Sequence, residues 1–166
     1  EMAIQAALTG HLVLSTLHTN DAPSALTRML ELGVPAYLLK ATVLGVMAQR
    51  LVRTLCPHCK VADSIAAVDW QELTAPWTVA MPKKVYRPEG CLECRNTGYM
   101  GRQGLYEILT LTEAVKNEIG EQLDIEAIRR QGIKEGMRTL RLSGAQKIAA
   151  GATTISEVMR VAPALR

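Results

Sequence analysis

The sequence predicts an α/β fold, in which capped helices accompany a short buried strand and a cysteine-bearing segment lies between two regular regions. Residues 11–17 form an apolar run that is rich in β-forming residues and bounded by turn signals, which is typical of a strand buried on both faces. Helical periodicity with capping residues lies on both sides of this run. Residues 55–98 contain all four cysteines and four of the seven prolines, so long regular elements are not expected there.

Composition excludes several classes of protein. Of the 166 residues, 48% are hydrophobic and 21% are charged, which is typical of a globular chain and not of a disordered one. Phe is absent, so we expect an aliphatic core. The net charge of +3 and the lack of a basic run do not indicate a nucleic-acid partner. The longest apolar stretch, residues 34–52, is interrupted by Lys40, Gln49 and Arg50 and does not indicate a membrane span. The start lacks a basic region like that of a signal peptide, and because it opens inside a helical pattern we expect a fragment of a longer protein.

The first elements follow from caps and periodicity. Residues 1–9 predict a helix that stops at Gly10, and the strand at 11–17 follows it. Asn20-Asp21 offers an N-cap for the next helix, Pro23 falls in its first turn, and Gly33 ends it. A further helix is predicted from Pro35 to about residue 51, with apolar positions most of the way round.

The second half predicts one strand and then helices. Residues 103–111 alternate in part and indicate a strand. The predicted caps of the helices that follow are Thr112 and Asp124 at N-termini, Gly120 and Gly151 at C-termini, and a capping box at residues 154–157. Gly144 lies inside a helical pattern, where glycine costs about 1 kcal/mol relative to alanine.

The four cysteines form two Cys-x-x-Cys pairs, Cys56 with Cys59 and Cys91 with Cys94. Each pair spaces two thiolates as a tetrahedral ion requires, and two pairs complete the coordination of a structural Zn²⁺. The intervening loop has little apolar content, so we expect the metal to supply its folding free energy. The sequence therefore predicts a structural four-cysteine zinc site.

Other chemistries for these cysteines are less favoured. Cys56-Pro-His-Cys59 has the letters of a disulfide oxidoreductase motif, but that motif follows a strand and opens a helix; here it is predicted to follow a helix, and the second pair would be unexplained. A disulfide framework requires an oxidising compartment. His58 as a ligand is disfavoured because a histidine between two ligands usually points away from the ion. Residues 91–102 also resemble one copy of the Cys-x-x-Cys-x-Gly knuckle of chaperone zinc domains, whose glycines turn backbone amides toward sulfur.

His11 and His18 lie at the two ends of the predicted strand. From the residues alone, core or capping histidines are the plainer interpretation. However, residues 9–20 resemble the histidine box of secretion and pilus-assembly ATPases. The wider likeness is to the type II secretion ATPases (general secretion pathway protein E family), with the type IV pilus assembly ATPases as close relatives. It is carried, in order, by residues 7–21, 45–57, 98–102, 136–140 and 155–161.

This resemblance implies the C-terminal part of a RecA-like P-loop motor domain. In that scheme residues 1–55 belong to the motor core, residues 56–96 form an inserted tetracysteine zinc module, and residues 97–166 form a mainly helical subdomain. It also implies a cytoplasmic homo-hexamer on the bacterial inner membrane that uses ATP and Mg²⁺, contacts inner-membrane secretion platform proteins, and assembles a pseudopilus. His11 and His18 would lie near the nucleotide γ-phosphate as a sensor or stabiliser.

One departure from the family concerns activity. The sequence has no Gly-x-x-x-x-Gly-Lys-[Ser/Thr], so the phosphate loop is missing, and no magnesium role is assigned to Glu1. We expect this fragment alone not to hydrolyse ATP. Three other functions remain open at this stage: a type IV pilus extension ATPase, a zinc-ribbon interaction module without nucleotide chemistry, and a redox protein. As a zinc-ribbon module, the chain would contact nucleic acid through four arginines, Arg95, Arg102, Arg129 and Arg130. Because no aromatic platform accompanies them, the simpler interpretation is that these arginines are solvated.

Overall fold

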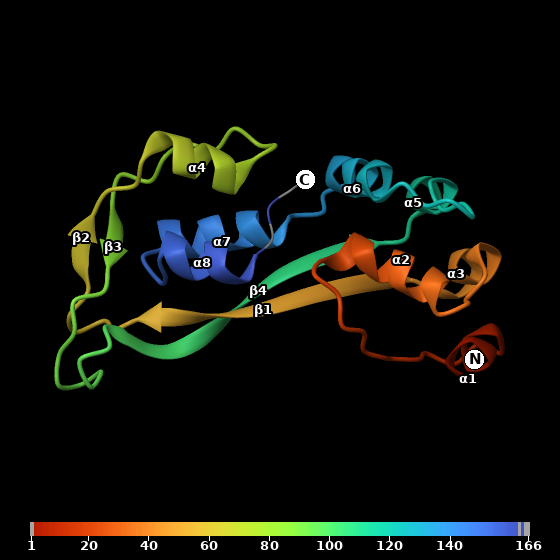
Figure 1. Ribbon diagram of the computed structural model, residues 1–166, viewed down its shortest axis with the longest axis horizontal. Helices are drawn as coiled ribbons and strands as arrows, with labels where there is room; N and C mark the ends of the chain where they lie inside the picture. The colour runs from red at the N-terminus through yellow and green to blue at the C-terminus, as the bar shows by residue number, and fades with distance from the viewer. Residues whose placement is uncertain (1, 163, 165–166) are drawn as a thin grey trace. The chain divides into compact units, whose positions relative to one another are not determined.

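The computed structural model describes residues 2–162 and residue 164, and it has the mixed α/β composition that the sequence predicts. Figure 1 shows the elements. In chain order they are α1 (Met2–Leu8), α2 (Ala22–Glu31), α3 (Ala36–Thr42), β1 (Gly45–Leu55), β2 (Val61–Asp63), α4 (Ala67–Thr74), β3 (Val85–Arg87), β4 (Tyr99–Thr110), α5 (Glu113–Asn117), α6 (Ile125–Lys134), α7 (Leu140–Ala149) and α8 (Ile155–Val161). Glu1, the first residue of the predicted helix 1–9, lies outside the described residues, as do residues 163 and 165–166 of the predicted helical part. Among the described residues, no helix combines the length and apolarity that crossing a membrane requires.

The chain forms two compact units, and both are discontinuous in sequence. Unit 1 contains residues 2–48 and 107–138, and unit 2 contains residues 49–106 and 139–162. These bounds differ from the predicted division at residues 55/56 and 96/97, because each unit takes part of each long strand. The three-part division describes the order of the motifs along the chain and remains a proposal.

Strands β1 and β4 pair with each other in one two-stranded sheet. The Leu111 amide donates to the Leu44 carbonyl at 3.0 Å beyond one end of the pair, and the Cys56 amide donates to the Gly98 carbonyl at 2.9 Å beyond the other. The strands therefore run in opposite directions, as Figure 1 also shows. Strands β2 and β3 form a second, antiparallel pair, with Val61 opposite Arg87 and Asp63 opposite Val85.

The predicted helix from Pro35 to residue 51 is wrong beyond residue 42. α3 ends at Thr42, Val43 is extended, and β1 begins at Gly45. Apolar residues that surround a helix also suit a strand, and periodicity alone does not separate the two. The pairing with β4, a partner distant in sequence, decides for the strand. Strand β4 itself, predicted at residues 103–111, is present and begins earlier, at Tyr99.

Unit 1 confirms most of the predicted caps. The Asp21 carboxylate accepts from the Ser24 amide at the start of α2, Pro23 lies in the first turn, and Gly33 follows the helix with φ +88°. Thr112 and Asp124 cap α5 and α6 as predicted. Gly120 is not a C-cap, because α5 already ends at Asn117. The core is aliphatic as expected; its buried side chains include Ala25, Leu26, Leu39, Leu109, Val115, Ile119 and Ile128.

Unit 2 contains a helical pair, α7 and α8, with α4 packed against α7 (Figure 1). Thr154 caps α8 by accepting from the Glu157 amide. A Cβ at Gly144 would lie 2.3 Å from Val158 Cγ1; the close packing of α7 on α8 therefore explains a glycine that costs helix propensity.

The segment between the cysteine pairs has its own buried residues, contrary to the expectation of a loop with little apolar content. Trp70 and Leu73 of α4 are 2% and 0% exposed, and Val85 of β3 is buried. Arg141 of α7 donates to Glu72 of α4 at 2.9 Å. Among the described residues, the core of unit 2 is thus aliphatic apart from the aromatic Trp70 and the buried cysteines, and the segment folds against the C-terminal helices.

Candidate functional site

The four cysteines lie on two turns that join the two strand pairs. Cys56 and Cys59 lie on the turn between β1 and β2, and Cys91 and Cys94 lie on the segment between β3 and β4. The first turn leads from β1 to β2, and the second leads from β3 to β4. Because β1 pairs with β4 and β2 pairs with β3, the two turns are held next to each other by a strand pair before them and a strand pair after them. The local fold therefore brings together cysteines that are 35 residues apart.

The sulfur geometry fits a tetrahedral ion. The Sγ atoms of Cys56 and Cys91 are 3.9 Å apart, and those of Cys59 and Cys94 are 3.8 Å apart, as are those of Cys91 and Cys94. All four Sγ atoms lie within 4.8 Å of one another. Metal–sulfur bonds of about 2.3 Å place the corners of a regular tetrahedron about 3.8 Å apart. This set of donors could hold a zinc ion.

Backbone amides point at two of the sulfurs. Gly90 donates to Cys59 Sγ at 3.3 Å, and the amides of Cys91 and Gly98 donate to Cys94 Sγ at 3.2 Å. Gly98 has φ +74°, and a Cβ there would lie 2.4 Å from Pro88 Cβ. Glycine is required at this position both for the conformation and for the space. Amide donors of this kind orient the ligands and stabilise thiolates.

The thiols by themselves share their protons unequally. For Cys94, burial opposes ionisation, but the Cys91 and Gly98 amides and the neighbouring thiols outweigh it and lower the pKa to about 6. For Cys59, burial and the neighbouring sulfurs outweigh the Gly90 amide and raise the pKa to about 12. The difference has a simple cause, since four adjacent sulfurs cannot all carry a negative charge without a cation between them.

The alternative chemistries fit this geometry less well. The sequence predicts that Cys56-Pro-His-Cys59 follows a helix, which would separate it from a disulfide oxidoreductase motif. This prediction is wrong, because the motif follows β1. The turn nevertheless leads into β2 and opens no helix. Separations of 3.8–3.9 Å are also far beyond the disulfide bond length of about 2.05 Å. His58 is exposed and lies outside the cluster of possible ligands among the described residues.

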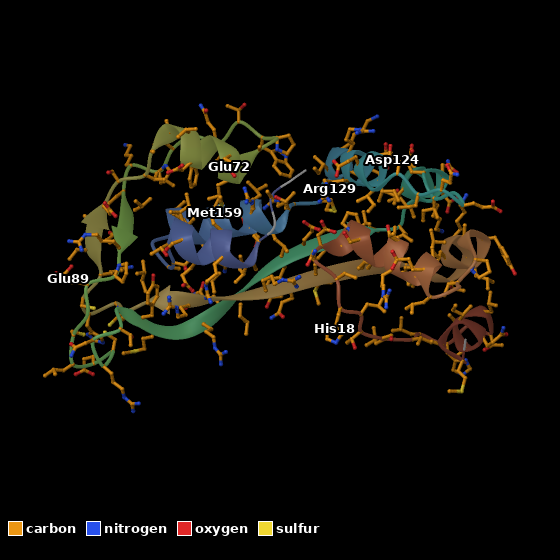
Figure 2. All side chains as sticks on the ribbon, in the orientation of Figure 1. His18, Glu72, Glu89, Asp124, Arg129 and Met159 are labelled. Carbon is orange, nitrogen blue, oxygen red and sulfur yellow. The ribbon has the colours of Figure 1, made fainter. Side chains whose placement is uncertain are left out.

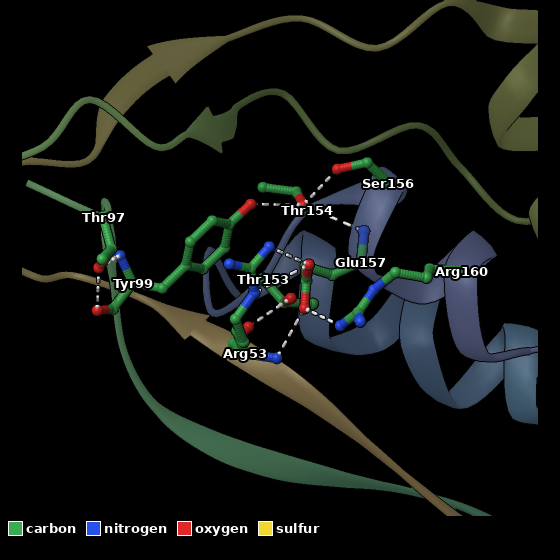
Figure 3. Close-up of polar contacts among 8 residues, drawn as sticks. All are labelled: Arg53, Thr97, Tyr99, Thr153, Thr154, Ser156, Glu157 and Arg160. Carbon is green, nitrogen blue, oxygen red and sulfur yellow. Dashed lines mark hydrogen bonds and ion pairs between the residues drawn. The ribbon is translucent and has the colours of Figure 1, made fainter.

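Strand β1, which leads into the first cysteine turn, is joined to α8 by polar contacts. Figure 3 shows the central group, in which Glu157 of α8 accepts from the Arg53 amide at 2.9 Å, from Arg53 Nη2 at 2.6 Å and from Arg160 Nη2 at 3.0 Å. Burial disfavours the charged form of Glu157, but these donors outweigh it and lower its pKa to about 2. The Arg53 guanidinium also lies 4.1 Å from the centre of the Tyr99 ring.

A second set of contacts lies nearer the metal-ligand turns. Lys60, next to Cys59, donates to the Gly151 carbonyl at 2.7 Å and lies 4.5 Å from the centre of the Tyr86 ring. Gly151 has φ +70°, in agreement with the predicted C-cap, and a Cβ there would lie 2.9 Å from the Tyr86 ring. The end of α7 is therefore fitted closely against the turn that carries the first cysteine pair.

The histidines do not lie on a strand. Residues 11–19 have no helix or strand assignment, and both His11 and His18 are exposed. Leu12 and Leu14 are 79% and 89% exposed, because within the described chain β1 pairs with β4, β2 pairs with β3, and no strand lies beside this segment. The predicted buried strand is therefore wrong for this chain. His11 Nδ1 lies 3.2 Å from Thr9 Oγ1 and 3.3 Å from the Ala6 carbonyl oxygen.

Two buried residues that contact the chain directly after the histidine segment (residues 9–20) are not predicted from the sequence. Glu107 of β4 and Arg129 of α6 are 2% and 8% exposed, and both contact the start of α2. Arg129 was predicted to be a solvated arginine, and this is wrong. No local pattern distinguishes it from Arg130, whose side chain is 70% exposed.

Comparison with known proteins gives a consistent result over the whole chain. The sequence model of the family described as type II/IV secretion system protein matches residues 1–160. The type IV pilus assembly ATPase TfpB of Acinetobacter baylyi is 54% identical over 162 residues, which cover 98% of this chain and 28% of that protein. The type II secretion system protein E of Aeromonas hydrophila is 43% identical, over 97% of this chain and 32% of that protein.

A third relative, the type II secretion system ATPase E of Vibrio cholerae, is 40% identical over 97% of this chain and 31% of its own length. The chain thus spans between 28% and 32% of the length of these three relatives. The matches extend through the histidine segment, both cysteine pairs and the C-terminal helices. Since the family model covers nearly every residue, the chain belongs to the type II/IV secretion system protein family.

Proposed function

We propose that this chain is the C-terminal part of an ATP-driven motor that assembles a pilus-type filament at the bacterial inner membrane. The observation that carries the proposal is identity of 40–54% over nearly the whole chain to proteins named as secretion or pilus assembly ATPases. In the full-length protein a RecA-like core binds ATP and Mg²⁺ through residues outside this sequence, six copies form a ring, and the ring contacts inner-membrane platform proteins.

Two filaments are candidates, the type II secretion pseudopilus and the type IV pilus. The resemblance noted in the sequence is first to the type II secretion ATPases, with the type IV pilus assembly ATPases as close relatives. The comparisons favour the pilus, since the pilus assembly ATPase TfpB shares 54% identity, against 43% and 40% for the two type II secretion relatives. We therefore place assembly of a type IV pilus first, and protein export through a type II system second.

The two histidines act on the nucleotide and not on the cysteine cluster. In this proposal His11 and His18 lie near the γ-phosphate and sense or stabilise it. Both histidines are exposed in this chain, which supports the idea that other parts of the full-length protein pack against residues 9–20. This sequence contains no phosphate loop, so the isolated chain should show no ATP turnover above a blank in a phosphate-release assay.

The cysteine cluster is structural. Cys56, Cys59, Cys91 and Cys94 would hold one Zn²⁺, whose chemistry at this site is to fix four thiolates in a tetrahedron. The chain's own residues supply the amide donors to Cys59 and Cys94 and the contact from Lys60 to Gly151 at the end of α7. All four positions are occupied by cysteine, which leaves no open coordination site for catalysis.

The test of the motor function uses the gene for the full-length protein. Its deletion should abolish surface pili and pilus-dependent motility, and the wild-type gene should restore both. Loss of protein export with intact pili would instead assign the type II pseudopilus. If both phenotypes stay normal and the purified full-length protein has no ATPase activity, the motor function is refuted and the zinc-ribbon module without nucleotide chemistry becomes the better interpretation.

A further inference from the structure

The start of α2 is fixed by three charged side chains, one from its N-cap residue, one from β4 and one from α6. Asp21 Oδ1 accepts from the Ser24 amide at 2.9 Å, and Asp21 Oδ2 accepts from Arg129 Nη2 of α6 at 2.9 Å. Glu107 Oε1 of β4 accepts from the Ala22 amide at 2.8 Å. All these residues belong to unit 1. Figure 2 labels Arg129 on α6 and His18 on the extended segment that leads into α2.

The three side chains are almost completely removed from solvent. Asp21 is 6% exposed, Glu107 is 2% exposed and Arg129 is 8% exposed. Burial opposes the charge on Asp21, but the Ser24 and Arg129 contacts outweigh it and lower the pKa of Asp21. Arg129 is held further by Glu126 Oε1, 3.2 Å from its Nε. The helix N-terminus also favours the negative charges placed there.

Such an arrangement is not explained by stability alone. Removing charges from water is costly, and a well-packed apolar group at the same place is often as stable or more stable than a buried ion pair. What these contacts do supply is direction, because one Asp21 oxygen accepts from the Ser24 amide and the other from Arg129 Nη2, which restricts how the chain enters α2. We therefore assign Asp21 and Arg129 the role of fixing the path of the chain at the start of α2.

The residue whose position they affect is His18, three positions before Asp21. Between them, Thr19 Oγ1 donates to the Asp21 carbonyl at 3.1 Å. The segment on the other side of His18 is held much less, since Leu12 and Leu14 are largely exposed. The buried contacts at Asp21 and Ala22 therefore fix the chain within four residues of His18.

We propose that Glu107 and Arg129, with Asp21 as the contact between them and the histidine segment, are positioning residues for His18 during ATP hydrolysis. The inference rests on the proposed function of the full-length protein. It also assigns α6 a role: because Arg129 lies on α6, a movement of that helix reaches the histidine through one ion pair. Misplacing a catalytic group by about 1 Å can cost on the order of 100-fold in rate.

The test measures ATP hydrolysis by the purified full-length protein. Asp21→Asn is the informative variant, because the amide oxygen can still cap α2 while the charge that holds Arg129 is lost. We expect kcat to fall at least about tenfold and KM for ATP to change less than about twofold, the pattern of a group that acts in the transition state. Arg129→Gln should do the same, and Arg129→Lys should recover part of the rate. The matched control is Arg130→Gln, because Arg130 is the next residue on α6 and its side chain is exposed.

A double-mutant cycle with His18→Ala separates positioning from a general structural role. If Asp21 acts through His18, Asp21→Asn should lower kcat less than about twofold in the His18→Ala background. An equal fall in both backgrounds, or a lower Tm with unchanged kcat, would overturn the inference. So would a His18→Ala protein with full activity.

Two further outcomes are distinguishable. If Asp21→Asn does not fold, Arg129→Gln carries the same test, since it removes the same ion pair and leaves the Asp21 cap of α2 in place. If the wild-type full-length protein has no ATPase activity, the proposed function fails, whereas activity in the wild type with no effect of these variants refutes only the positioning role.

Discussion

The four-cysteine cluster and the histidine segment were both recognised from short motifs, but only the cluster is assembled by this chain. Both cysteine pairs, the amides that face them and the parts of β1 and β4 next to them lie within residues 49–106 of unit 2. The histidine segment has strand-forming side chains, yet no strand lies beside it among the described residues. A ligand set can be completed by a few nearby turns, whereas a buried strand requires neighbours on both sides. Motif spacing therefore predicts a metal-ligand set more reliably than it predicts a buried strand.

The largest expected effect comes from breaking the cluster. Cys94→Ser, or removal of metal with a strong chelator, should unfold the cysteine turns, since structural zinc contributes about 10–16 kcal/mol in small zinc domains and a whole domain is stable by only about 5–15 kcal/mol. We expect loss of one zinc per chain in a metal analysis and loss of the unit 2 transition in thermal unfolding.

His58→Ala is the matched control for this experiment, because His58 lies between Cys56 and Cys59 in sequence and is exposed. It should keep one zinc per chain and change the free energy of unfolding by less than about 0.5 kcal/mol. A metal-free native chain with unchanged stability would contradict the structural role of the cysteines.

The second effect concerns Glu157, whose side chain is 3% exposed beside two arginines. Glu157→Gln should lower the free energy of unfolding by about 2–3 kcal/mol at neutral pH. This is less than the 3–5 kcal/mol of a fully buried pair, because Arg53 and Arg160 can return to water. Urea unfolding of unit 2 measures it.

The pH dependence of the same contact has a defined sign. The pKa of Glu157 is lowered to about 2 in the folded state, from about 4.3 in an unfolded chain. Its contribution is therefore complete above about pH 5 and is lost as the pH falls from about 4.3 toward 2. The Glu157→Gln protein should lack this part of the acid slope, and an identical slope in both proteins would show that Glu157 is not the group responsible.

A smaller loss is expected from Gly144→Ala. Helix propensity favours alanine by about 1 kcal/mol, but the new Cβ would lie 2.3 Å from Val158 Cγ1. Overpacking should dominate and lower the free energy of unfolding by about 1–3 kcal/mol. Gly120→Ala is the control, since its nearest contact would be an ordinary 3.5 Å. A stabilised Gly144→Ala protein would mean that α7 and α8 pack more loosely than described.

The smallest effect tests the histidine segment directly. Leu14 is 89% exposed, so Leu14→Ser in this chain should change the free energy of unfolding by less than about 0.5 kcal/mol. In the full-length protein, where we propose that the segment is completed, the same change should cost several times more. Equal and negligible effects in both proteins would refute that completion.

The sequence predicts features that depend on neighbouring residues and misses those that depend on distant ones. The caps at Asp21, Thr112, Asp124 and Thr154 were predicted correctly, because a cap is formed within four residues. Residues 45–51 of β1 are predicted as helix, wrongly, because the pairing partner β4 lies more than 40 residues away. The buried Trp70 was missed for a related reason, since α4 packs on α7 of the C-terminal part.

The candidate sites show the same limit. Cys-x-x-Cys spacing predicted the four sulfurs that converge, and the predicted glycine contribution is present at Gly98. Glu107 and Arg129 were not predicted as contacts of the histidine segment, because the hydrogen bonds that join them to it span 85 and 108 residues. A charged residue gives no sign in the sequence that it is buried opposite a distant partner.

The way the chain alternates between its two units has a consequence for its synthesis. Residues 2–48 need residues 107–138 to finish unit 1, and residues 49–106 need residues 139–162 to finish unit 2. During translation, therefore, neither unit can close before most of the polypeptide has left the ribosome. The turns with the cysteines emerge well before the helices that cover them, so a metal captured at that stage would bind a nascent chain whose remaining contacts are still to be made.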